Sequence, residues 1–281
     1  MKIVTSISEL AAVRREWEKD SFNVGLVPTM GALHDGHLSL IDQIRPSVDK
    51  VVVSIFVNPK QFGPNEDFEK YPRTFMEDRS LLEGKKVDLL FMPAAEEFYP
   101  KDFSNSISNI RFSNILCGAA RPGHFDGVLT VVMKLFSVVK PRAAIFGKKD
   151  FQQLQLIKSM VKDFCLDILI LEGPVVRETS GLAMSSRNRY LTDAERQKAA
   201  VIHRALKAIK NKVEQSIVRK DHLISMAAEL ITEKNSISIE YIEIRKPSLE
   251  PFDDEIRAPA VVLAAVKLGS VRLIDNLEIH E

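Results

Sequence analysis

The feature that most constrains this fold is a series of short, continuously apolar runs in the first 175 residues. Val, Ile, Leu and Phe fill these runs with little of the polar alternation that a half-exposed strand shows. Continuous runs of this kind are typical of parallel strands whose two faces are both covered. The runs lie at residues 24–27, 50–57, 87–93, 143–147 and 166–172.

Stretches with helical patterns separate these runs, at residues 6–19, 36–45, 74–84, 125–139 and 149–163. Strand–helix–strand repetition predicts an α/β domain built on a doubly wound parallel sheet. Ligands of such sheets bind beyond the carboxyl ends of the strands. We therefore expect the chemistry of this chain in the loops that follow the apolar runs.

The pattern changes near Pro174. A helix is predicted over 192–214, where Thr192 and Glu195 form a capping box, and a second helix over 220–234. Strand patterns follow at 238–246, 259–269 and 271–279, the last two joined at a Gly-Ser turn. The sequence thus predicts two domains, 1–175 and a smaller α+β domain, 176–281.

The overall charge excludes some classes of partner. Basic residues number 39 and acidic residues 38, so the net charge of +1 does not favour a dedicated nucleic-acid or membrane-surface protein. Cys117 and Cys165 lack metal-ligand spacing and indicate free thiols in a reducing compartment. No secretory signal is recognisable, and the longest apolar runs fall short of the roughly 20 residues of a membrane span. We expect a soluble cytoplasmic protein.

The stretch "MGALHDGH", residues 30–37, follows the first apolar run and opens the next helix. Gly31 and Gly36 permit close backbone approach, and a helix N-terminus attracts phosphate. His34 and His37 would share one face of a helical turn and could donate hydrogen bonds to a triphosphate. A zinc site is the alternative, but it needs more ligands than this pair supplies. A second alternative is an ordinary pair of surface or core histidines whose hydrogen bonds are made within the protein.

A second stretch, "FGKKDFQQ" at 146–153, also follows an apolar run. Its lysines suit phosphate, and its aspartate suits ribose hydroxyls. The neighbouring Gln152 and Gln153 can bind hydroxyls or a carboxylate. A solvated helix start remains the alternative for these residues.

A third stretch, "RETSGLAMSSRNRYL" at 177–191, lies at the domain junction and offers Ser185, Ser186 and Arg187 to a phosphate. The alternative is a loop with a serine N-cap. A fourth, "VNPKQFGPNEDFEKYPR" at 57–73, is a long loop in which we interpret residues 62–73 as a lid. Its Asn58 and Gln61 could bind a small polar substrate, and an ordinary surface loop is the alternative.

Other motifs narrow the function. The chain has no P-loop, no GxGxxG after the first apolar run and no GxSxG elbow. The turn "RPGHFDG" at 121–127 leads into an amphipathic helix, and we interpret its Arg121 and His124 as structural support. A dimer contact or a substrate contact is the alternative for these two residues. The sequence therefore favours nucleotide chemistry other than that of P-loop enzymes or dinucleotide oxidoreductases.

Taken in order, these stretches resemble the pantoate–β-alanine ligase (pantothenate synthetase) family. The resemblance runs through nearly the whole chain, more loosely in the last third. The family is similar to class I aminoacyl-tRNA synthetases and other nucleotidyl-transferring enzymes with a Rossmann-like sheet. "HDGH" stands where those enzymes carry HxGH, and "MSSRN" stands in place of their lysine-containing second signature.

The resemblance implies a role for individual residues. His37 would be the acid that assists pyrophosphate departure, helped by His34, Lys149 and Arg187. Gln61 and Gln153 would bind pantoate, and Gln61 would also receive β-alanine. The residues implied in ATP binding are Met30, Gly31, Ala32, Leu33, His34, Asp35, Gly36, His37, Gly147, Lys148, Lys149, Asp150, Val176, Met184, Ser185, Ser186 and Arg187.

The resemblance further implies that (R)-pantoate attacks the α-phosphorus of MgATP and that β-alanine then attacks the resulting acyl-adenylate. Mg²⁺ would be coordinated mainly by the ATP phosphates, and Asp78 is the candidate protein ligand. The smaller domain would close over the site, and the family implies a homodimer. Competing interpretations are an adenylyltransferase with a phosphorylated acceptor, a non-catalytic nucleotide sensor and an RNA-binding relative of the synthetases.

Overall fold

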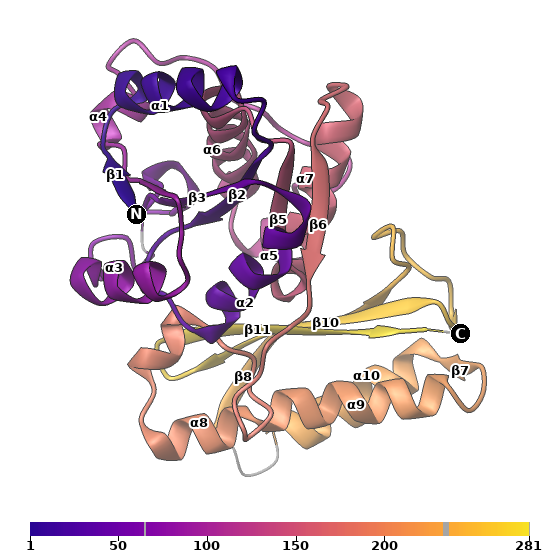
Figure 1. Ribbon diagram of the computed structural model, residues 1–281. Coiled ribbons are helices and arrows are strands. Elements are labelled where there is room, and N and C mark those ends of the chain that lie inside the picture. The colour runs from indigo at the N-terminus through magenta and orange to yellow at the C-terminus, as the bar shows by residue number, and fades with distance from the viewer. Residues whose placement is uncertain (65, 233–235, 281) are drawn as a thin grey trace. The chain divides into compact units, whose positions relative to one another are not determined.

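The computed structural model describes residues 1–64, 66–232 and 236–280. The chain divides into two compact units (Figure 1). The first unit comprises Met1–Lys148 and Leu156–Pro174, and the second comprises Lys149–Gln155 and Val175–Glu281. The short segment Lys149–Gln155 thus groups with residues that are distant in sequence.

The first unit is built on a six-stranded parallel sheet. In spatial order its strands are β1 (Lys2–Val4), β4 (Leu89–Phe91), β3 (Lys50–Ile55), β2 (Val24–Thr29), β5 (Ala143–Gly147) and β6 (Leu169–Gly173). From β2 the chain adds strands on one side and later returns to add β5 and β6 on the other. The strand order therefore reverses between β2 and β5, where α/β proteins of this kind bind ligands.

Helices cover both faces of this sheet. They are α1 (Ile7–Lys19), α2 (Asp35–Ile44), α3 (Phe75–Gly84), α4 (Ala95–Phe98), α5 (Cys117–Ala120) and α6 (His124–Val139), with the 3-10 turns η1 (Arg45–Ser47) and η2 (Pro59–Gln61). The turn η3 (Lys148–Asp150) and helix α7 (Phe151–Asp163) each contain residues of both units. In Figure 1, α1 and α6 lie on one side of the strands, and α2 and α3 on the other.

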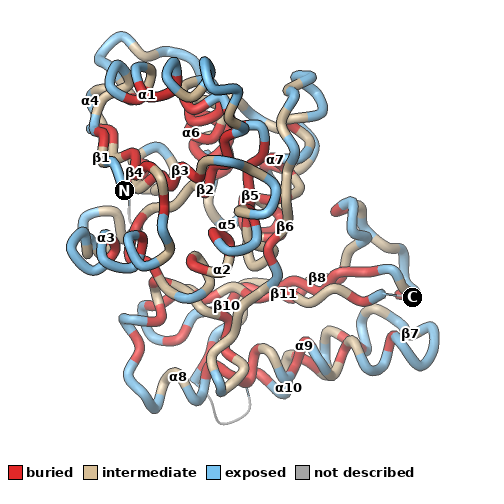
Figure 2. Tube along the Cα trace, viewed as in Figure 1, coloured by how far each residue is buried: buried red, intermediate tan, exposed pale blue. Residues whose placement is uncertain are grey.

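Alternation along the strands explains the two faces. Val27, Val51 and Val53 pack with Ile41 of α2 and Leu82 of α3 in one buried cluster. The intervening residues, which point to the opposite face, are buried as well (Figure 2). Continuous apolar strands are what such a two-sided burial requires. The predicted doubly wound parallel sheet is confirmed.

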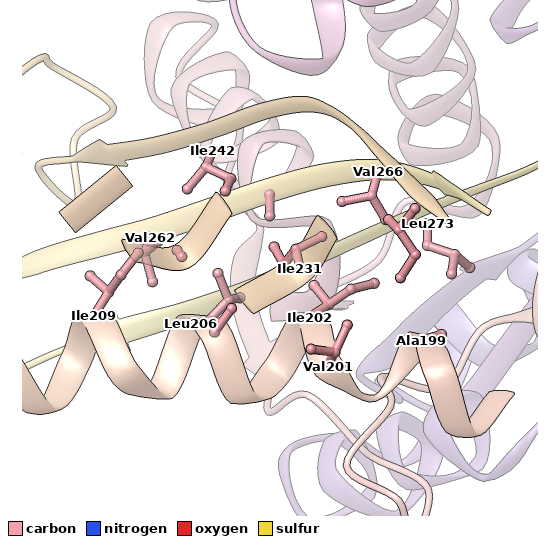
Figure 3. Close-up of a cluster of buried hydrophobic side chains, with 14 of the residues drawn as sticks. Ala199, Val201, Ile202, Leu206, Ile209, Ile231, Ile242, Val262, Val266 and Leu273 are labelled. Atoms are coloured by element: carbon pink, nitrogen blue, oxygen red, sulfur yellow. The ribbon is translucent and has the colours of Figure 1, made fainter. Parts of the chain in front are cut away.

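The second unit combines helices with an antiparallel sheet. Its helices are α8 (Asp193–Ala199), α9 (Val201–Val213) and α10 (Lys220–Thr232), with the 3-10 turn η4 (Ser186–Tyr190). Its main sheet has the order β11 (Val271–Ile279), β10 (Ala260–Leu268), β8 (Ile237–Arg245), and β7 (Val218–Arg219) pairs with β9 (Glu255–Ile256). Figure 3 shows residues of α9, such as Ile202 and Leu206, against Val262 and Val266 of β10.

The helical predictions for this unit are confirmed in part. The capping box at Thr192 and Glu195 is confirmed. The single helix predicted over 192–214 is wrong, because Ala200 separates α8 from α9. The predicted end of the next helix at 234 lies outside the described residues. Among the described residues, no helix is long and apolar enough to cross a membrane.

Candidate active site

The loop after β2 lies at the reversal of strand order and has a fixed backbone. Gly31 and Ala32 both have positive φ, +80° and +49°. The Asp78 carboxylate of α3 accepts hydrogen bonds from the backbone N–H groups of Ala32 at 2.9 Å and Leu33 at 2.8 Å. Thr74 donates to the same carboxylate at 3.2 Å. Asp78 is 1% exposed, so these bonds form in a buried environment and hold the loop in place.

The loop ends at the histidine pair. His34 is the N-cap of α2, and its Nδ1 accepts a hydrogen bond from the backbone of Gly36 at 3.1 Å. This bond leaves the proton of the neutral ring on Nε2. The ring of His37 lies 4.1 Å from that of His34, centroid to centroid, at an interplanar angle of 33°. Two imidazoles thus stand together at a helix N-terminus, where anions are stabilised.

The residues of the loop present different groups. Gly31, Ala32 and Leu33 are buried, and the Leu33 side chain belongs to the core between sheet and helices. Only backbone atoms of Leu33 can therefore serve a ligand. Asp35 is exposed, and Gly36 is partly exposed in the first turn of α2.

Gln61 is held from several directions within the first unit. Its Nε2 lies 3.0 Å from the sulfur of Met30, and its Oε1 accepts from Asn58 at 3.0 Å. Asn58 also donates to the Gly127 carbonyl and accepts from Tyr99 at 2.9 Å. Burial raises the pKa of the Tyr99 hydroxyl, which therefore stays protonated as a donor. The carboxamide of Gln61 is thereby oriented with its N–H groups towards Met30.

The backbone of Gln61 is anchored by the turn before α6. The Gln61 carbonyl lies 3.1 Å from Arg121 Nη2 and 2.7 Å from His124 Nδ1. Arg121 also lies 2.9 Å from His124 Nε2, which places the His124 proton on Nδ1, as a donor to Gln61. These contacts give Arg121 and His124 a supporting role.

Arg121 also ties down the loop at 62–73. It forms a bidentate ion pair with Glu66, at 2.6 and 2.5 Å. Burial opposes ionisation of the Glu66 carboxyl, but Arg121 outweighs burial and keeps the pKa of Glu66 below its ordinary value. Phe62 packs edge-on against Tyr71, which is buried. The described part of the loop is therefore anchored to the first unit; its Asn65 lies outside the described residues.

Gly147 and Lys148 mark the carboxyl end of β5, beside β2. The Lys148 ammonium lies 3.5 Å from Glu172 of β6, which Lys158 also contacts at 2.6 Å. Burial opposes ionisation of Glu172, but the two lysines outweigh it and lower its pKa. The Lys148 ammonium group thus forms an ion pair with Glu172 within the protein.

The second unit contains the rest of the predicted nucleotide residues. Lys149 lies 3.8 Å from the Asp150 carboxylate, and its side chain is 20% exposed. Gln152 is buried, whereas Gln153 is partly exposed on the first turn of α7.

Val176 and Met184 lie side by side, because the chain reverses direction between them. The Met184 N–H donates to the Val176 carbonyl at 2.9 Å, and Arg177 forms a β-bridge with Ala183. We call this segment, residues 176–184, the β-hairpin. Ser185 follows it as the N-cap of η4, and its hydroxyl accepts from the Arg187 N–H at 3.3 Å. The β-hairpin therefore brings the predicted contacts at 176 and 184–187 into one surface.

Buried side chains of Asn188 and β11 support these segments. Asn188 donates to Glu178 at 2.8 Å and to the Ala183 carbonyl at 3.1 Å, bracing the β-hairpin. Asp275 of β11 binds both terminal nitrogens of Arg177, and Asn276 donates to the Lys149 carbonyl at 2.7 Å. The sequence analysis did not single out Asp275 or Asn276. Within "VRLIDNLEI" they read as ordinary polar positions of a strand.

The described residues do not form a protein-built metal cage. Within residues 1–64, 66–232 and 236–280, no group of three or more His, Cys, Asp or Glu side chains is arranged to hold a metal ion. Both oxygens of Asp78, the predicted Mg²⁺ ligand, already accept backbone N–H groups.

The fold and these loops define the class of protein: an α/β nucleotide-binding enzyme with two histidines at a helix N-terminus beside the reversal of strand order. A profile of the pantoate–β-alanine ligase family matches residues 2–278. The chain belongs to the pantoate–β-alanine ligase family.

Individual relatives agree with this assignment. The chain is similar to the pantothenate synthetase of Caldicellulosiruptor bescii, 44% identical over 280 residues, with 100% of this chain and 99% of the relative covered. That of Thermotoga petrophila is 46% identical over 277 residues, covering 98% of this chain and 99% of the relative.

Solved structures are similar over the same length. The pantothenate synthetase of Thermus thermophilus superposes with a TM-score of 0.93 at 42% identity, covering 100% of both chains. The pantoate–β-alanine ligase of Francisella tularensis, described as a complex with β,γ ATP and β-alanine, gives a TM-score of 0.82 at 36% identity, covering 99% of this chain and 97% of that one.

Proposed function

We propose that this protein condenses (R)-pantoate with β-alanine to give pantothenate, while ATP is cleaved to AMP and pyrophosphate. A pantoate carboxylate oxygen attacks the α-phosphorus of ATP, and the bond to pyrophosphate breaks. The amine of β-alanine then attacks the acyl carbon of the pantoyl-adenylate, loses a proton and displaces AMP. Membership of the family over almost the whole chain is the observation that carries this proposal.

The site's chemistry suits the first step. In that step negative charge grows on the leaving pyrophosphate, so the enzyme must position reactants and stabilise charge rather than supply a nucleophile. His34 and His37 stand at the N-terminus of α2, where their N–H groups add to the positive end of the helix dipole. We assign His37 as the acid that assists pyrophosphate departure and His34 as a phosphate contact.

The family resemblance assigns further ATP contacts to residues of each unit. In the first, the backbone of Met30–His37 and the residues Gly147 and Lys148 would bind ATP. In the second, Lys149 and Arg187 would bind phosphate, Asp150 would accept bonds from ribose hydroxyls, and Val176 would contact adenine through its backbone. The β-hairpin supports this last group, because it joins Val176 to Met184, the residue before Ser185 and Ser186.

Gln61 and Gln153 are the proposed pantoate ligands. Neutral amides can bind both the hydroxyl groups and the carboxylate of pantoate. The Asn58 contact fixes which end of the Gln61 carboxamide donates. Gln61 would also receive β-alanine. We further propose that the loop at 62–73 and the smaller domain, 176–281, exclude water from the acyl-adenylate, which water would hydrolyse.

Mg²⁺ would enter as part of the MgATP substrate, neutralising phosphate charge with water in its remaining positions. Both oxygens of Asp78 already accept backbone N–H groups, which supports an arrangement in which the phosphates supply the ligands. Asp78 as a direct ligand is the alternative, and replacement of Asp78 by asparagine distinguishes the two. We also propose a cytoplasmic homodimer, which the family resemblance supports and light scattering would check.

Product analysis tests the proposed function. The enzyme is incubated with MgATP, pantoate and, separately, β-alanine, glycine, γ-aminobutyrate or no amine. We expect pantoate-dependent exchange of labelled pyrophosphate into ATP without any amine, and pantothenate plus AMP when β-alanine is added. Pyrophosphate exchange that does not depend on pantoate, or transfer of AMP to a phosphorylated acceptor, would overturn the proposal in favour of an adenylyltransferase.

A further inference from the structure

The last strand of the second unit contains two adjacent polar residues whose side chains reach separate segments. Asp275 and Asn276 of β11 are each 4% exposed. Successive residues of a strand point to opposite faces of the sheet. Asp275 shares its face with Leu273, in the core beneath α9, and Asn276 points to the other face.

Asn276 contacts the lysine segment on its face. Its Nδ2 donates to the Lys149 carbonyl at 2.7 Å, across 127 positions of sequence. Lys149 is the second residue of η3, the short turn that joins β5 to α7. The bond from Asn276 therefore supplies a fixed point for the backbone that carries Lys149 and Asp150.

Asp275 contacts the β-hairpin on its own face. Its two carboxylate oxygens accept from Arg177 at 2.7 and 2.9 Å in a bidentate pair. Arg177 also donates to the Gly181 carbonyl at 3.1 Å and to the Asn276 carbonyl at 3.3 Å. One guanidinium thus links the β-hairpin, which contains Val176 and Met184, to β11.

A gain in folding stability does not by itself explain why these polar side chains are buried here. Buried ion pairs lose much of their Coulombic gain to desolvation, and apolar replacements of similar volume are often at least as stable. A buried side-chain bond to a distant backbone carbonyl instead restricts where that backbone can lie. In this unit the two restricted segments are the ones that the proposed function assigns to ATP.

We propose that Asn276 and Asp275 are positioning residues for ATP: Asn276 sets the backbone of Lys149, and Asp275 sets the β-hairpin through Arg177. This inference rests on the proposed function, since it takes both segments as nucleotide contacts. Both side chains are buried, and the proposal gives neither of them a contact with substrate. Both act on the first half-reaction, in which ATP is consumed, and not on the attack of β-alanine on preformed adenylate.

The test compares the two half-reactions in the full-length enzyme. Pantoate-dependent ATP–pyrophosphate exchange reports the first, and pantothenate formation from synthetic pantoyl-adenylate and β-alanine reports the second. For Asn276→Ala we expect exchange to fall about tenfold, mainly through a higher KM for ATP, as loss of one buried hydrogen bond predicts. The second half-reaction should change less than about twofold.

A packing control separates positioning from loss of fold. Leu273→Val, on the same strand, trims a buried side chain without touching the polar links. It should lower the melting temperature but leave the ratio of the two half-reactions unchanged. If the alanine variant folds poorly, Asn276→Ser, which keeps a shorter polar side chain, is used to compare the two half-reactions instead. Direct titration with ATP should show weaker binding for both Asn276 variants and not for the control.

Coupling to Lys149 supplies a further check. Because Asn276 acts through the backbone of Lys149, the double variant Lys149→Ala/Asn276→Ala should lose less than the product of the single losses. Equal losses in both half-reactions for the Asn276 variants, or unchanged ATP binding, would overturn this inference. A wild-type enzyme that lacks pantoate-dependent exchange would instead overturn the proposed function, so the two failures are distinguishable.

Discussion

Replacing Asp78 by asparagine tests how the loop that contains the histidine pair is held. Both carboxylate oxygens of Asp78 accept buried backbone N–H groups, from Ala32 at 2.9 Å and Leu33 at 2.8 Å. Asparagine keeps the shape but turns one acceptor into an NH₂ group that faces an N–H. Asp78→Asn therefore leaves two buried donors without acceptors: the new NH₂ group and the backbone N–H that faces it.

The size of the effect follows from those two donors. Each buried unsatisfied polar group costs about 1–3 kcal/mol, and removal of the buried charge offsets part of the sum. We expect a loss of about 2–4 kcal/mol in unfolding free energy, which corresponds to roughly 6–12 °C in the melting temperature of a unit of this size. Pyrophosphate exchange should fall as well, because Ala32 has positive φ and the loop before His34 loses its anchor.

Calorimetry in the presence of EDTA measures this loss without any metal. Glu83→Gln is the matched control on α3, since Glu83 forms an exposed ion pair with Arg79. The control should cost less than about 1 kcal/mol. The anchor interpretation is refuted if Asp78→Asn and the wild-type enzyme have the same melting temperature in EDTA while the substitution shifts the Mg²⁺ dependence of activity. Asp78 would then be a metal ligand.

Three further predictions concern single side chains. His37→Ala should lower pyrophosphate exchange at least about 10²-fold without loss of fold, whereas exposed His222→Ala should not; unchanged exchange would remove His37 from the mechanism. Gln153→Ala should raise the KM for pantoate about tenfold and leave that for ATP nearly unchanged, and equal increases would contradict its role. Burial, reinforced by the Arg177 charge, lowers the pKa of His203 below 6.5, so the unfolded chain protonates this histidine at a higher pH than the folded chain does. Wild-type stability should therefore decline more than that of His203→Gln as the pH falls below 6.5, and parallel declines in chemical denaturation would contradict this account.

Local patterns predicted most of the secondary structure correctly. Continuous apolar runs identified β2 through β5 because a strand buried on both faces has mostly apolar positions. The edge strand β6 was also identified, although most of its residues are partly or fully exposed. The three-residue β1 was missed, since its length shows no periodicity. The break at Ala200 was also missed, because alanine continues a helical pattern and nothing in the local sequence marks the bend.

The loops that contain the candidate site could also be found from sequence. Glycines and histidines after an apolar run, and lysines after another, have chemical meaning wherever those runs become parallel strands. Even so, the pattern did not show that His34 would use its Nδ1 to cap α2. That role depends on the backbone direction at the loop's end.

The sequence by itself determined β2 to β6, most of the longer helices and the residue types available for phosphate, because these depend on near neighbours in the chain. Only the tertiary structure decided what holds them. Asp78 meets Leu33 across 45 positions, and Asn276 meets Lys149 across 127. Such bonds join a common polar side chain to a backbone group that every residue possesses. No local pattern can therefore reveal the partner before the chain has folded.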